Sequence, residues 1–85
     1  MNLDSPEFKA VMFASTVLHA QGRCREAVAT VETELPKMLP ECLPVAYLGI
    51  IWAAENANLR EKAREYALKL KVIEPSHPAV ARILG

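Results

Sequence analysis

The sequence feature that most constrains the fold is a short motif that occurs twice. Gly22 to Ala27 reads GRCREA, and Asn58 to Ala63 reads NLREKA, 36 residues further along the chain. Each copy begins with Gly or Asn, two residue types that tolerate the left-handed backbone with which many helices end. A helix–turn–helix unit repeated at this interval is typical of solenoids, in which helical pairs stack on one another.

Apolar residues recur at helical spacing along almost the whole chain, and no segment alternates with the two-residue period of a strand. Pro36, Pro40 and Pro44 interrupt this spacing, and they mark a connector because proline is disfavoured inside a helix. The predicted fold class is therefore all-α, with two antiparallel helical hairpins and a short C-terminal capping helix. The expected helices cover residues 6–20, 23–35, 41–56 (beginning between 41 and 44), 59–73 and about 77–84.

Two alanines hold the same inward position in the two copies of the repeat, Ala27 in the first and Ala63 in the second. A methyl side chain lets two helices approach closely, whereas a leucine would hold them apart. The inward stripe of the fourth expected helix runs as far as Ile73. Glu32 and Glu34 are expected on the outer side of the second helix.

The third expected helix contains LPVAYLGIIWAA and is apolar on almost every side, which is typical of a helix covered from more than one direction. Two interpretations stay open for Leu48 and Trp52. They belong to the core, covered by the fifth helix, or they form a surface that binds another protein. Hydrophobic residues make up 52% of a chain of 85 residues, and a small chain buries only a limited share of its surface. These residues must therefore be covered either by the core or by a partner.

The repeated unit resembles the tetratricopeptide repeat. The fit is best in the second unit, at Tyr47, Ile50, Ala63, Ala67 and Pro75. It is looser in the first unit, where Glu34 stands at a position that is usually small. The resemblance implies a single domain over residues 1–85, with repeats at about 6–39 and 41–75 and a C-terminal helix at about 77–84.

In that family the first helix of each pair lines a concave groove that holds a partner. The resemblance therefore implies partner-binding roles for Met12, Thr16, His19, Val45, Leu48, Trp52 and Glu55. Most of these side chains are apolar, and an apolar groove suits the apolar face of an amphipathic helix. Some members instead clamp a terminal carboxylate of a heat-shock chaperone with Lys and Asn, but Met12, Thr16 and Gly49 occupy those positions here.

The run VLHAQGRCREAVATVETEL, together with the chain length, is similar to the small chaperones that hold the needle subunit of bacterial type III secretion systems. This resemblance implies a cytoplasmic bacterial protein that wraps the amphipathic C-terminal helix of the needle subunit. It also implies a hetero-oligomer completed by a small co-chaperone, in which premature polymerisation is prevented. The alternatives are a generic repeat adaptor, including a fragment of a longer solenoid, and a self-associating structural protein.

The composition argues against several other functions. Ten Lys and Arg balance ten Asp and Glu, whereas nucleic-acid binding needs a basic surface. No apolar stretch is long enough to span a membrane, and MNLDSPEF lacks the features of a secretory signal. Cys24 and Cys42 are expected to be small buried side chains without a disulfide, and neither they nor His19 and His77 form a zinc pattern. We expect no enzymatic activity, no cofactor and no metal.

Overall fold

The computed structural model describes all of residues 1–85 and contains helices and no strands, which confirms the predicted all-α class. Two short 3₁₀ helices, η1 (Leu35–Lys37) and η2 (Pro40–Cys42), form the connector. No helix is both long and apolar enough to cross a membrane. The α-helices are α1 (Pro6–Ala20), α2 (Cys24–Glu34), α3 (Leu43–Asn56), α4 (Arg60–Ile73) and α5 (Pro78–Leu84).

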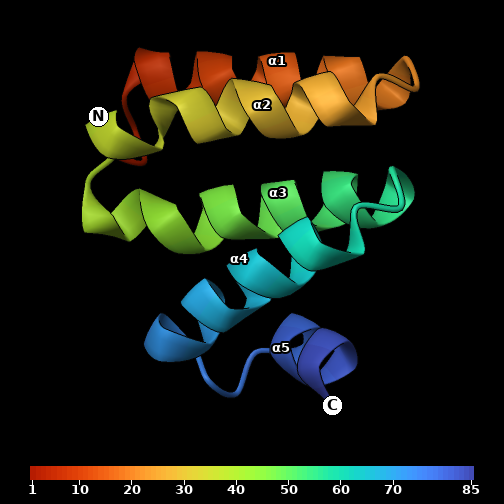
Figure 1. Ribbon diagram of the computed structural model, residues 1–85. Coiled ribbons are helices and arrows are strands. Elements are labelled where there is room, and N and C mark those ends of the chain that lie inside the picture. Colours follow the sequence, from red (N-terminus) through yellow and green to blue (C-terminus); the bar gives the residue numbers. More distant parts are fainter.

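The helices pack in chain order, each against the next, and α1 also touches α3 (Figure 1). The second helix runs back alongside α1, and α3 lies between this pair and α4 (Figure 1). The short α5 packs against α4 at the C-terminal end of the molecule. As a result α3 is the central helix, with neighbours on several sides.

The two copies of the sequence motif form the same turn. Gly22 and Asn58 both have positive φ angles, 78° and 58°, as their residue types predict. The amide of Arg23 donates to the carbonyl of Leu18 at 2.9 Å, and the amide of Leu59 donates to the carbonyl of Ala54 at 2.8 Å. This six-to-one hydrogen bond caps the last turn of α1 and of α3 in the same way.

One face of α3 forms the centre of the core. Ala46, Ile50, Ala53 and Ala54 are at most 1% exposed. Ala27 and Ala63 are buried as expected, and the buried hydroxyl of Ser15 donates to the carbonyl of Ala27 at 3.1 Å. The small side chains allow α2 and α4 to approach α3 closely, which keeps the core dense.

The N-terminal segment is joined to the connector between α2 and α3. The amide of Leu39 donates to the carbonyl of Met1 at 2.8 Å, and the amide of Leu3 donates to the Glu41 carboxylate at 3.3 Å. Cys42 is buried beneath this contact, Cys24 is half-buried, and both thiols are free. The proline-rich connector is therefore an ordered segment, and its hydrogen bonds to the N-terminus hold the start of α3 in place.

Two expectations about side-chain direction are wrong. Ile73 is 45% exposed because the buried stripe of α4 ends at Leu70. Glu32 is half-buried, and its carboxylate accepts hydrogen bonds from Lys62 Nζ at 3.0 Å and Tyr66 Oη at 2.7 Å. The long side chains of α4 reach across to α2, so Glu32 joins the two helices.

These contacts perturb two side chains of α4. The hydrogen bond and the charge of Glu32 raise the pKa of Lys62 above its usual value. Burial raises the pKa of Tyr66, and the hydrogen bond to Glu32 raises it further. Both shifts favour the protonated side chain in the folded protein.

Candidate partner-binding surface

The second apolar face of α3 is open to solvent. Val45 is 43% exposed, Trp52 is 55% exposed, and Leu48 between them is half-buried. These three residues, which we call the α3 face, recur at helical spacing on one side of the helix. Trp52 is therefore not a core residue, although it belongs to the most apolar helix of the chain.

The first helix borders the α3 face along one side. A methyl group added at Gly49 would lie 2.9 Å from Met12 Cε, so the missing side chain makes room for Met12. The His19 ring lies over Trp52 with its centroid 3.8 Å away, and His19 Nε2 is 2.6 Å from Asn56 Nδ2. Three predicted site residues, Met12, His19 and Trp52, are thus held between α1 and α3.

The other two predicted polar site residues, Thr16 and Glu55, make no side-chain hydrogen bond with His19 or Trp52. Thr16 is exposed on α1, and its hydroxyl donates to the carbonyl of Met12 at 2.9 Å. Glu55 follows Trp52 by one turn and accepts a hydrogen bond from the guanidinium of Arg82 on α5. Glu55 therefore marks the end of the α3 face that α5 approaches.

Sequence reasoning missed Phe13, which is 72% exposed and lies next to Met12 on α1. Val17, one turn later, is also exposed. Neither residue lies on the inward stripe of α1 or on a position carried over from the repeat family. A signal was present, because Glu7 and Lys9 in the first turns are the only Asp, Glu, Lys or Arg residues of α1.

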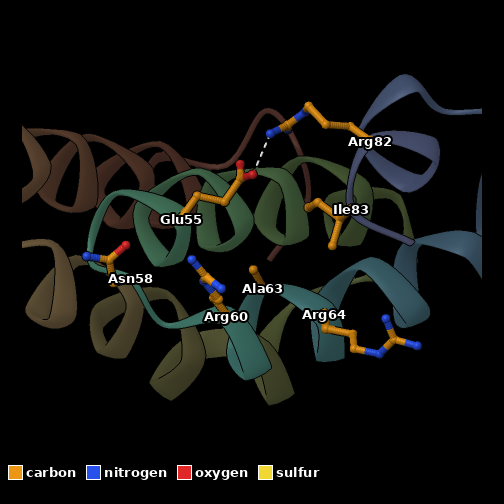
Figure 2. Close-up of a pocket in the computed structure, with 7 residues that line it drawn as sticks. All are labelled: Glu55, Asn58, Arg60, Ala63, Arg64, Arg82 and Ile83. Carbon is orange, nitrogen blue, oxygen red and sulfur yellow. Dashed lines mark hydrogen bonds and ion pairs between the residues drawn. The ribbon is translucent and has the colours of Figure 1, made fainter. Parts of the chain in front are cut away.

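A cleft of about 370 Å³ lies beside the Glu55 end of the α3 face (Figure 2). We call it the arginine cleft because three arginines, from α4 and α5, line it. Arg82 is paired with Glu55, which raises the pKa of Arg82, whereas Arg60 and Arg64 make no ion pair. Its lining residues are Glu55, Asn58, Arg60, Ala63, Arg64, Arg82 and Ile83.

The side chains of this surface are mainly apolar, with arginines at one end. No group of three or more His, Cys, Asp or Glu side chains is placed to hold a metal ion. Every buried side-chain nitrogen or oxygen has a hydrogen-bond partner. An exposed apolar strip with a Trp and a Met is typical of sites that bind another protein.

Comparison with protein-family models, with curated proteins and with solved structures finds no match to this chain. The resemblances to the tetratricopeptide repeat and to the needle chaperones therefore stay predictions from the residues. The functional proposal below therefore rests on the exposed apolar side chains of the α3 face.

Proposed function

We propose that this protein is a chaperone that holds an amphipathic helix of a partner protein along the α3 face. The observation that carries the proposal is the exposure of Trp52 and Val45, with half-buried Leu48 between them, on a helix that buries Ala46, Ile50 and Ala54 on its other side. An apolar face of this kind is stabilised by covering it with a second apolar helix face. The 14 residues of α3 span about 21 Å, the length of a bound helix of similar size.

In this proposal the helices form two tetratricopeptide-like hairpins, α1 with α2 and α3 with α4, and α5 caps the second. The contacts of Met12 with Gly49 and of His19 with Trp52 support it, because they align the first helices of the two units side by side. The α3 face then lies on the concave side, with α1 along one edge. Phe13 adds a further exposed apolar side chain on α1.

We propose further that the partner is the needle subunit of a type III secretion system, and that the complex forms in the bacterial cytoplasm with a small co-chaperone. A needle subunit polymerises through apolar helical surfaces, so covering such a surface prevents polymerisation by competition, without ATP. A stable one-to-one complex typically buries about 800 Å² on each partner. Release then requires another component that removes the subunit.

The test is co-expression with the needle subunit of the same organism, followed by size-exclusion chromatography with light scattering. We expect a defined heteromer with the unaltered chain and none with Trp52→Glu, because a charge would be buried in an apolar contact. Val72→Glu is the matched control, since Val72 is 83% exposed and belongs to α4 rather than to α3.

Circular dichroism of the free variants separates binding from folding. Equal helix content in both variants is the expected result. Loss of helix in Trp52→Glu would show that Trp52 stabilises the fold and would contradict the proposal. A chain that forms a homodimer broken by Trp52→Glu, and ignores the needle subunit, would instead identify a self-associating protein.

A further inference from the structure

The arginine cleft adds a charged site to the apolar surface. Arg60 and Arg64 project from the first two turns of α4, and Arg82 projects from α5 (Figure 2). Arg60 extends toward Glu55, whereas Arg64 extends outward at the edge of the cleft (Figure 2). Three arginines and one glutamate line the cleft, so the cleft has an excess of positive charge.

Arg60 and Arg64 form no ion pair, and Glu55, the single acidic residue that lines the cleft, is engaged by Arg82. A planar guanidinium binds a carboxylate through two parallel N–H groups. Ala63 and Ile83 give the cleft an apolar wall beside these groups. This combination fits a carboxylate carried next to an apolar side chain.

The position of the cleft relates it to the α3 face. Glu55 lies one turn beyond Trp52, so a helix lying along Val45, Leu48 and Trp52 ends beside the cleft. The C-terminal end of a helix carries a partial negative charge, and a chain end or nearby Asp and Glu residues add to it. The other end of the α3 face, around Val45, has no comparable cluster of arginines.

We propose that the arginine cleft binds carboxylates at the C-terminal end of the helix that the α3 face holds, and so determines the direction in which that helix lies. This inference rests on the proposed function. The carboxylates come from the chain end or from acidic side chains in the last turn. The two sources share one chemistry and are distinguished by the probes below.

The probe is a synthetic helix of about 16 residues, about 24 Å long, made of Leu, Ala and Gln with a fluorophore at its N-terminus. One form ends in a free carboxylate, and a second ends in an amide. A third ends in an amide and has Glu in its last turn, and a fourth ends in an amide and has Glu in its first turn. Affinity is measured by fluorescence anisotropy at low salt, where charge effects are least screened.

We expect the free acid or the C-terminal Glu form to bind about tenfold more tightly than the amide, the size of one charge-assisted hydrogen bond. The peptide that binds more tightly than the amide identifies the source of the carboxylate, either the chain end or an acidic side chain in the last turn. The N-terminal Glu form should bind no better than the amide. Arg60→Gln with Arg64→Gln should remove the gain and leave the affinity for the neutral amide unchanged.

The matched control is Lys69→Gln with Lys71→Gln, which removes the same charge from the other end of α4. An equal loss in this control would show a general charge effect and overturn the inference. Equal affinity for all four peptides, with binding that depends on Trp52, would overturn the inference alone. If no peptide binds, or if Trp52→Glu has no effect on binding, the proposed function itself fails.

Discussion

The two apolar faces of α3 differ in what covers them. The face formed by Ala46, Ile50 and Ala53 is at most 1% exposed, whereas the face of Val45, Leu48 and Trp52 is open. Both faces are hydrophobic, so hydrophobicity alone does not separate core from interaction surface. The covered face combines Ile50 with alanines, which let neighbouring helices approach closely, whereas the open face presents a Trp that no helix fully covers.

The open face is also bordered by contacts that leave it accessible. Met12 and His19 meet it from α1, and Arg82 meets its end from α5. The His19 ring covers part of Trp52, which still stays 55% exposed. This distinction between a covered and an open face can be tested by substitutions on the same helix.

Ile50→Ala should have the largest effect on stability, because it removes a side chain with no exposed surface. Truncating a buried aliphatic side chain to Ala costs about 2–5 kcal/mol, through lost burial and the cavity left behind. Urea unfolding followed by circular dichroism measures the loss. A change below about 1 kcal/mol would show that the covered face is loosely packed.

Trp52→Ala should show the reverse behaviour. We expect the free energy of unfolding to change by less than about 1 kcal/mol, because the side chain is largely in water. Binding of the partner helix should weaken by about thirtyfold, as for a hot-spot residue that contributes about 2 kcal/mol. Calorimetric titration measures the affinity, and a loss of stability as large as that of Ile50→Ala would place Trp52 in the core.

High pH should weaken the side of the molecule where α4 meets α2. The pKa values of Lys62 and Tyr66 are raised in the folded protein, so the folded chain keeps these protons to higher pH than the unfolded chain. Their stabilising contribution is complete below about pH 10 and is lost as the pH rises through the folded values.

Thermal unfolding between about pH 8 and pH 11 measures this loss, and Glu32→Gln should make it smaller because it removes the charge that raises both pKa values. His19→Gln is the control, because His19 meets Asn56 and forms no hydrogen bond with Glu32, Lys62 or Tyr66. It should leave the decline above pH 10 unchanged. An unaltered decline in Glu32→Gln would contradict the role given to this contact.

Gly49→Ala should have the smallest effect. Its new methyl would lie 2.9 Å from Met12 Cε, the mobile end of a flexible side chain, so Met12 can move aside. Replacing Gly by Ala inside a helix contributes up to about 1 kcal/mol, which offsets the shift. We expect a melting temperature equal to or slightly above that of the unaltered chain, and a clear decrease would show that α1 and α3 are packed rigidly at this point.

Local signals in the sequence were sufficient for much of the fold. Helix spacing, the turn residues Gly22 and Asn58, and the prolines of the connector predicted the helices and their boundaries to within a few residues. The buried alanines Ala27 and Ala63 followed from the repeat. These features depend on neighbours in the chain, so they can be read without knowledge of the tertiary structure.

The candidate surface could not be predicted fully, because it is formed by contacts between residues that lie far apart in the sequence. The third helix is apolar on almost every side, so its hydrophobic periodicity does not show which face is buried and whether Trp52 is covered. Glu32 was placed outside because its partners, Lys62 and Tyr66, lie about 30 residues away and reach it through long side chains. The arginine cleft likewise exists only because α5 brings Arg82 next to α4.

Trp52 is the proposed contact point for the partner helix. Trp52 is the single Trp of the chain, so its fluorescence reports on the α3 face alone. The most direct measurement is to titrate the protein with a Trp-free C-terminal helix of the needle subunit while following Trp emission and its quenching by acrylamide. We predict an emission shift to shorter wavelength and loss of quenching at a one-to-one ratio. Complex formation with unchanged emission and quenching would contradict this account.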